Sequence, residues 1–275
     1  MPFKNLVPFP SWCFLIDKPA IALTFQNLEF PLRQLWRYHQ FRMGVQGLET
    51  YDAVSRWFRD RRKKRLLDGL SRLHDILGRD LEVIDVGGVE GFWEVTGCPP
   101  FANITILNLP EAFEKPYWFN NRMPKIRKKV GSALDLSMWR NGRTDLVISN
   151  SVIEHVGDWA KIEIAARELR GVAPNGWVQT PAFSFPIEPH FALPFIHWFA
   201  APIRAKILPI VPHHGAGASC DVGRARHAVE ENNLLSAAEF RFLFRDAMIH
   251  RERFLGLTKS LIATWGAMTP DPTGN

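Results

Sequence analysis

Three polar residues stand out as groups that could move a proton, because each is set among apolar neighbours. Glu154 and His155 belong to DLVISNSVIEHV at 145–156, and His190 lies in the aromatic segment FSFPIEPHFALPFIHWF at 183–199. Burial shifts the pKa of such groups, and a side chain tuned in this way can act as a general base. We select His190 as the preferred base and keep His155 and Glu154 as further candidates. The alternative is structural: Glu154 and His155 cap or pack the next helix, and His190 is a satisfied core histidine.

A glycine-rich turn is the second feature with chemical potential. The segment VIDVGGVEGFWEV at 83–95 is an apolar run ending near Asp85, followed by Gly87, Gly88 and Gly91. Glycines let a backbone come close to a ligand, and backbone N–H groups between a strand and a helix suit a carboxylate or phosphate. A single turn of this kind can also be only a tight connection between two elements.

The elements that must position these residues alternate between strand and helix. Apolar runs favour strands at 82–86, 104–107, 145–149, 177–180, 247–249 and 259–264, and helical spacing favours helices at 159–169 and 234–244. Residues 28–75 show helical spacing as well. Such alternation is typical of an α/β sandwich with a mainly parallel sheet, in which ligands bind at the carboxyl ends of the strands.

Five of these blocks, in this order, resemble the class I S-adenosylmethionine-dependent methyltransferases over about residues 80–266. The blocks are VIDVGGVEG, ITILNL, GSALDL, DLVISNSVIEHV and LRGVAPNGWVQTP. The resemblance implies a three-layer α/β/α sandwich with a mainly parallel seven-stranded sheet of Rossmann-like type, closed by an antiparallel hairpin that turns at Gly256. It also implies S-adenosyl-L-methionine as cofactor. Val89 departs from the family pattern, since it stands at the middle glycine of the turn.

The resemblance also assigns roles to single positions. Asn108 stands where an acidic group usually binds the ribose hydroxyls, Asp135 would accept from the adenine amino group, and Asn150 would face the methionine part. An amide at position 108 offers a neutral and therefore weaker hydrogen bond than a carboxylate. The expected cofactor-binding residues are Asp85, Gly87, Gly88, Gly91, Asn108, Asp135 and Asn150.

The expected organisation is a basic helical extension over residues 1–78 and a methyltransferase domain over 79–268, with an apolar lid inserted at about 183–230. Spaced prolines exclude a continuous helix there, and the aromatic content favours a wall over a binding site. The expected reaction is methyl transfer to O or N of a partly apolar small molecule. The alternatives are a degenerate methyltransferase-like binding module and a nicotinamide-dependent oxidoreductase, against which the missing GxGxxG counts.

Charge and cysteine usage restrict partners and compartment. Residues 1–75 carry 13 Lys and Arg against 7 Asp and Glu, so the net charge of +6 belongs to this quarter of the chain. The run RDRRKKR at 59–65 could contact an anionic membrane or nucleic acid weakly, but a solvated helix face just before the main domain is the favoured interpretation.

Three dispersed cysteines and the prolines and charges around the apolar run 6–16 favour a cytoplasmic protein without a signal peptide. The apolar stretch 189–203 is too short to span a membrane. No cysteine or histidine cluster has zinc spacing, so we assign no metal ligand, and the sequence does not indicate whether a metal assists. The sequence does not indicate the oligomeric state.

Overall fold

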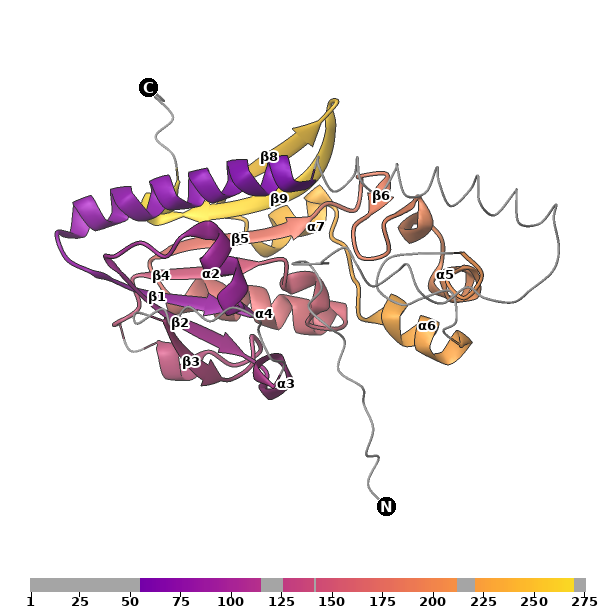
Figure 1. Ribbon diagram of the computed structural model, residues 1–275, viewed down its shortest axis with the longest axis horizontal. Coiled ribbons are helices and arrows are strands. Elements are labelled where there is room, and N and C mark those ends of the chain that lie inside the picture. The colour runs from indigo at the N-terminus through magenta and orange to yellow at the C-terminus, as the bar shows by residue number, and fades with distance from the viewer. Residues whose placement is uncertain (1–54, 115–125, 141, 212–220, 270–275) are drawn as a thin grey trace, which may run out of the picture.

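A seven-stranded sheet forms the centre of the computed structural model, which describes residues 55–114, 126–140, 142–211 and 221–269 (Figure 1). The strand order is β3-β2-β1-β4-β5-β9-β8. The first five strands in this order run parallel, and β9 runs antiparallel to both of its neighbours, β5 and β8. The strands are β1 (Leu81–Val86), β2 (Ala102–Asn108), β3 (Ile126–Val130), β4 (Leu146–Asn150), β5 (Asn175–Pro181), β8 (Met248–Phe254) and β9 (Leu257–Trp265).

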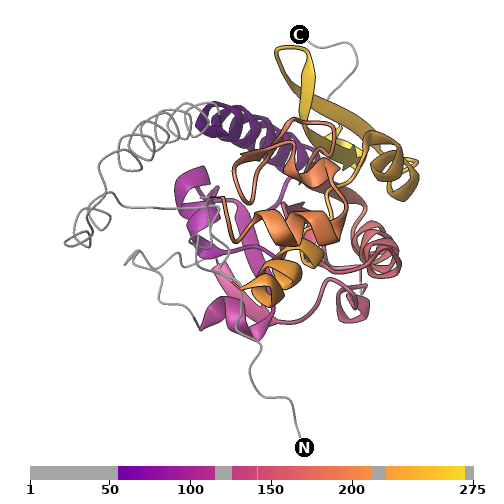
Figure 2. The same cartoon turned by 90° about the vertical axis from the view of Figure 1, so that its right-hand side faces the viewer.

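Both faces of the sheet are covered, as the continuous apolar character of its inner strands requires. One face packs against a helix described over residues 55–77, which contributes Leu66, Leu70 and Leu73 to a core shared with β1 and β2. The other face packs against α4 (Trp159–Val172) and α7 (Ala237–Leu243). Figure 2 shows the helix over 55–77 and α4 on opposite sides of the sheet. The predicted three-layer sandwich is therefore confirmed.

Short helices connect the strands along the rest of the sheet. The helix α2 follows the glycine turn, a short α-helix and two 3-10 turns follow β2, β3 and β4, and a third 3-10 turn follows the last strand. Their bounds are α2 (Glu90–Thr96), α3 (Pro110–Phe113), η1 (Ser137–Trp139), η2 (Ile153–His155) and η4 (Gly266–Met268).

Strand prediction from apolar runs succeeded where strands are buried. All six predicted strands are present, with the final hairpin turning at Leu255 and Gly256, both of which have positive φ. The apolar pattern did not mark β3, because this edge strand is largely exposed and reads IRKKV. The predicted helix at 234–244 begins only at Ala237, because Ser236 and Glu239 form a capping box there.

A small unit inserted after β5 lies beyond the carboxyl ends of the parallel strands (Figure 1). Its described part holds a two-stranded hairpin and three short helical segments, and its core includes Phe191, Ile196, Leu208 and Val229. These elements lie within residues 183–230, and the role of this segment as a lid stays a prediction. Its elements are β6 (Ile187–Glu188), β7 (Leu193–Pro194), η3 (Ile196–Trp198), α5 (Ala201–Ile207) and α6 (Val222–Glu230).

The basic run 59–65 lies on the helix over residues 55–77. Arg62 forms an ion pair of 2.6 Å with Glu252 on β8, and both side chains are nearly buried. Arg62 therefore ties the helix to the last hairpin. The proposed contact of this run with anionic surfaces stays a prediction. Among the residues described, none of the helices has the length and apolar character that crossing a membrane requires.

Candidate functional site

The glycine turn between β1 and α2 is built so tightly that two of its positions exclude a side chain. Gly87 has φ +76°, and a Cβ there would lie 2.5 Å from a methyl of Val152. At Gly88 a Cβ would lie 2.0 Å from Oδ2 of Asp85. Since real Cβ atoms do not come this close to their neighbours, both positions require glycine. Gly91 lies buried in α2, one step further from the turn.

The side chain of Asp85 packs against the backbone of this turn. Its carboxylate is buried and accepts a hydrogen bond of 2.8 Å from Nε1 of Trp93. Burial raises the pKa of Asp85 to about 7, and the bond from Trp93 only partly offsets that increase. The structure thus places Asp85 beneath the backbone of Gly88, where it shapes the turn.

Asn108 ties the end of β2 to the same turn. Its Nδ2 donates to the carbonyl oxygen of Gly88 at 2.8 Å, and its Oδ1 accepts from the backbone N–H of Leu109 at 2.8 Å. An amide nitrogen has two hydrogens and an amide oxygen two lone pairs, so each group keeps one position for a further partner. A carboxylate could not donate to Gly88, and this bond gives a physical reason for asparagine here.

Asp135 follows β3 in an exposed turn. Its Oδ1 accepts from the backbone N–H of Ser137 at 3.0 Å. Hydrogen bonds from Ser137 lower the pKa of Asp135, so the group is ionised at neutral pH. The side chain is an accessible acceptor at the same edge of the sheet as Asn108.

Asn150 ends β4 in the middle of this edge. Its Oδ1 is buried and has no hydrogen-bond partner among the described residues. The next residue, Ser151, has φ +56° and bonds through N and Oγ to the backbone and side chain of Gln179 on β5. A buried acceptor without a partner costs about 1–3 kcal/mol, so a ligand that donates to Asn150 would recover that energy.

Glu154 is completely buried behind the same edge. Its Oε2 accepts from Oγ1 of Thr180 at 3.0 Å, while Oε1 has no hydrogen-bond partner among the described residues. Burial raises the pKa of Glu154 to about 7, although the nearby charge of His190 opposes this shift. Glu154 also anchors a loop, since its carbonyl oxygen accepts from the backbone N–H of Asn233 at 2.8 Å.

His155 and His190 meet in a hydrogen-bonded chain that starts at Glu188. Nδ1 of His190 lies 2.5 Å from the buried Glu188 carboxylate, and its Nε2 lies 3.1 Å from Nε2 of His155. Nδ1 of His155 faces the carbonyl oxygen of Glu231 at 3.2 Å, so this nitrogen must be the donor. The Nε2 of a neutral His155 then accepts from His190.

These contacts decide which of the two histidines has the higher pKa. Burial would lower the pKa of His190, but the bond and charge of Glu188 outweigh burial and raise it. The pKa of His155 is lowered, mainly by desolvation and to a smaller extent by the charge of His190. His190 is therefore the stronger base, and Glu188 fixes its orientation as a carboxylate does for histidine in hydrolase triads.

The structure brings the three proton-moving candidates together. One ligand atom from each of Glu154, His155 and His190 lies within 4.8 Å of the others, which is also close enough to hold a metal ion. Glu188 was visible in the sequence as a carboxylate among aromatic residues, yet only the β6–β7 hairpin reveals its contact with His190. His197, another histidine of the insertion, instead bonds to the carbonyl oxygen of Phe183 at 2.9 Å.

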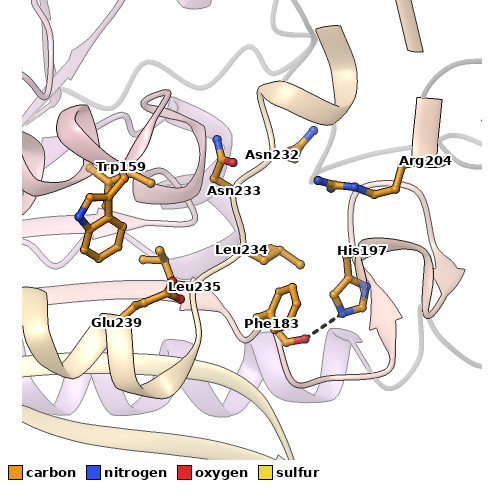
Figure 3. Close-up of a pocket in the computed structure, with 10 residues that line it drawn as sticks. Trp159, Phe183, His197, Arg204, Asn232, Asn233, Leu234, Leu235 and Glu239 are labelled. Carbon is orange, nitrogen blue, oxygen red and sulfur yellow. Dashed lines mark hydrogen bonds between the residues drawn. The ribbon is translucent and has the colours of Figure 1, made fainter. Parts of the chain in front are cut away.

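A cavity of about 270 Å³ lies beside this cluster, between α4, the insertion and the segment 232–235 (Figure 3). No pattern in the sequence marks this cavity, because α4, the insertion and residues 232–239 each supply part of its wall. The lining residues are Trp159, Ile162, Phe183, His197, Arg204, Asn232, Asn233, Leu234, Leu235 and Glu239.

The sheet topology, together with the turn after β1, identifies the fold. Five parallel strands in the order β3-β2-β1-β4-β5 are extended by β9, which runs antiparallel between β5 and β8. The chain has the class I methyltransferase fold. Its glycine turn follows β1 at the carboxyl edge of the parallel strands.

Comparisons with known proteins found similarities at low sequence identity only. No family model matches the chain. No curated protein matches it either. An O-methyltransferase family protein from Burkholderia thailandensis is 15% identical with a TM-score of 0.43, and the match covers 76% of this chain and 58% of that protein. This chain thus spans less than two thirds of that protein's length.

Two N-methyltransferases match over most of their own length. The 1,6-didemethyltoxoflavin-N1-methyltransferase of Burkholderia thailandensis is 14% identical with a TM-score of 0.42, covering 88% of this chain and 92% of that one. NodS from Bradyrhizobium japonicum is 13% identical with a TM-score of 0.42, covering 74% and 94%.

Proposed function

We propose that the protein is an S-adenosyl-L-methionine-dependent methyltransferase that transfers a methyl group to O or N of a partly apolar small molecule. The observation that carries this proposal is the shared edge of the sheet. The glycine turn, Asn108, Asp135 and Asn150 lie at the carboxyl ends of β1 to β4, and the paired His190 and Glu188 lie beside the end of β4.

The residues at this edge fit the cofactor. Gly87 and Gly88 expose backbone without a side chain, which the methionine part can approach closely, and the unpartnered Oδ1 of Asn150 suits an ammonium donor. Asn108 keeps one donor and one acceptor position for ribose hydroxyls, and Asp135 accepts from the adenine amino group. Asp85 and Gly91 act by shaping the turn. When bound, the cofactor supplies an electrophilic methyl group on a sulfonium.

The chain's own contribution to catalysis is orientation and proton transfer. Holding the acceptor in line with the methyl group supplies much of the acceleration. His190 first releases to solvent the Nε2 proton that it donates to His155. As the acceptor oxygen or nitrogen gains the methyl group, its proton then passes to Nε2 of this neutral His190. Glu188 stabilises the resulting imidazolium through Nδ1. His155 lies at the same nitrogen and is displaced by the acceptor or bonds to it, while Glu154 holds the surrounding loop.

We propose that a shared proton, and not a metal ion, links the two histidines. Each ring nitrogen of the pair already has a protein partner, and one oxygen of Glu154 is taken by Thr180. Dialysis against EDTA should therefore leave turnover unchanged, and a loss of turnover that zinc or magnesium restores would refute this assignment.

Ligand-induced stabilisation tests the cofactor assignment against the two alternatives. Thermal unfolding is followed with S-adenosylmethionine, S-adenosylhomocysteine and NAD in parallel. A ligand at about 100 times its Kd adds about 2.7 kcal/mol, which is several degrees in Tm for a chain of this size. We expect a shift with both sulfur nucleotides and none with NAD. A shift with NAD alone would favour an oxidoreductase, and no shift at all would favour the degenerate binding module.

A pair of glycine variants links the binding to the turn. Both Gly87 and Gly97 have positive φ, but a Cβ at Gly97 meets no atom within 4 Å. Gly87→Ala and Gly97→Ala thus carry similar backbone strain, and only the first collides with Val152. We expect Gly87→Ala to weaken S-adenosylhomocysteine binding at least about tenfold in calorimetry. Equal binding by both variants would place the cofactor elsewhere.

A further inference from the structure

The cavity beside the histidine pair collects buried polar atoms that the protein leaves without partners. Nδ1 of His197, Oδ1 of Asn232 and Nε of Arg204 are all buried and make no hydrogen bond with the described residues. All three residues line the cavity, and Figure 3 shows them grouped at one end of it. His197 and Asn232 are more than nine-tenths buried. Each unmade bond costs about 1–3 kcal/mol, which a fitting ligand would return.

The existing hydrogen bonds define what that ligand must offer. Nδ2 of Asn232 donates to the carbonyl oxygen of Ala228 at 2.6 Å, which leaves Oδ1 as an acceptor. Nε2 of His197 faces the Phe183 carbonyl oxygen and must donate to it, so Nδ1 of the neutral ring is also an acceptor. The ligand therefore presents a hydroxyl or amino donor to this end of the cavity.

Arg204 adds a requirement for negative charge. Its guanidinium forms no ion pair with the described carboxylates, although the charge of Glu188 is close enough to stabilise it. Glu239, the carboxylate that lines the cavity, is drawn at the opposite end in Figure 3 and accepts from the backbone N–H of Ser236. A guanidinium binds a carboxylate through two parallel hydrogen bonds, so a carboxylate is the fitting anion.

The remaining walls and the size set the body of the ligand. Ile162, Phe183, Leu234 and Leu235 give the cavity an apolar side. A volume of about 270 Å³ is at the small end of ligand pockets and fits a molecule with a single ring.

The cavity is coupled to the histidine pair through one short loop. The carbonyl oxygen of Glu231 accepts from His155, and the backbone N–H of Asn233 donates to Glu154. Between these two contacts lies Asn232, which faces the cavity. The loop that carries Asn232 therefore borders the cavity and also contacts Glu154 and His155.

We infer that this cavity recognises the methyl acceptor, and that the acceptor is a small carboxylic acid with an apolar ring and a hydroxyl or amino group. This inference rests on the proposed function. The carboxylate pairs with Arg204 and a hydroxyl or amino group donates to Asn232 or His197, while the oxygen or nitrogen that is methylated is a separate group directed at Nε2 of His190.

Calorimetric titration with a matched set of probes tests the inference. The probes are the three hydroxybenzoate isomers, benzoate, phenol and inorganic phosphate, each added to the full chain with and without S-adenosylhomocysteine. We expect at least one hydroxybenzoate to bind about tenfold or more tightly than benzoate or phenol, because each of these lacks one of the two required groups. Failure of every hydroxybenzoate to bind, or tighter binding of phosphate, would overturn the inference.

Variants at two arginines of the insertion distinguish recognition of the carboxylate by Arg204 from a non-specific effect of positive charge. Arg204→Gln removes the cation from the cavity, and Arg224→Gln removes an exposed cation of α6 that lies outside it. We expect a loss of at least about tenfold in hydroxybenzoate affinity for Arg204→Gln, partial recovery in Arg204→Lys and no change in Arg224→Gln. Equal affinity of all variants would refute the role of Arg204, and unchanged Tm values show that each variant is folded.

The cofactor titration in the same samples keeps two failures apart. Binding of S-adenosylhomocysteine without any hydroxybenzoate would leave the proposed function standing and overturn the acceptor class. Binding of a hydroxybenzoate that depends on Arg204, without S-adenosylhomocysteine binding, would refute the proposed function and with it the description of the ligand as a methyl acceptor.

Discussion

Replacing Asp85 by asparagine should make the protein more stable at neutral and alkaline pH. The Asp85 carboxyl is buried under the glycine turn, and its pKa in the folded protein is about 7. In an unfolded chain an aspartate has a pKa of about 3.9. Between these two values the folded protein binds a proton that the unfolded chain does not, so stability falls as pH rises through this window.

The size of this effect follows from the difference in pKa. About three pKa units at about 1.4 kcal/mol each give about 4 kcal/mol that is lost once the pH exceeds about 7. Asparagine keeps an oxygen that accepts from Trp93 and carries no charge. We therefore expect Asp85→Asn to exceed the wild type by up to about 4 kcal/mol at pH 8, with a gap of less than about 2 kcal/mol at pH 5.

Urea unfolding at several pH values between 5 and 8 measures this gap directly. Glu154 also has a raised pKa, but it is present in both proteins and cancels in the difference. Asp145 provides a control of opposite sign, because its ion pair with Arg79 outweighs its burial and lowers its pKa. Asp145→Asn should lose stability most at pH 8. If Asp85→Asn is no more stable than the wild type at pH 8, the carboxyl is not held protonated by burial.

The remaining predictions concern the base and the N-terminal helix. His190→Ala should lower kcat about 100-fold or more with an acceptor from the binding screen, and unchanged turnover would remove His190 from catalysis. Because Glu188 raises the pKa of His190, Glu188→Gln should move the rise of kcat with pH to lower pH. Arg62→Met leaves Glu252 buried without its partner and should cost about 3–5 kcal/mol in urea unfolding, whereas Lys64→Met, in an exposed pair, should cost less than about 1 kcal/mol. Similar costs for these two variants would contradict the anchoring role of Arg62.

Most of the fold could be predicted because the information is local. Buried parallel strands appear in the sequence as short apolar runs. Glycines in the sequence marked the turn after β1 and the final hairpin, and in the structure Gly87 and Gly256 have positive φ there. The edge strand β3 lacks such a run, since Arg127, Lys128 and Lys129 are exposed on it. Only the resemblance to a known family implied a strand in that region.

The candidate site was less predictable because loop paths decide it. His155 and His190 are 35 positions apart, and their contact depends on the β6–β7 hairpin folding back over the end of β4. Neither apolar periodicity nor spacing gives that path. The cavity is a stronger case, because Arg204, His197 and Asn232 come from two helical segments and a loop that have no common sequence pattern.

The two ends of β4 show how the chain separates stability from binding. At the amino end the carboxylate of Asp145 accepts from Arg79 and from the backbone N–H of Glu82, and its backbone oxygen accepts from Asn175. At the carboxyl end the buried Oδ1 of Asn150 has no partner among the described residues. A buried polar group gains nothing for stability until it is bonded, so the open acceptor at Asn150 is a cost that only a ligand would offset. In parallel sheets the carboxyl edge is where ligands bind, and the unmet bonds at Asn150, Glu154 and the cavity all lie on that side of this sheet.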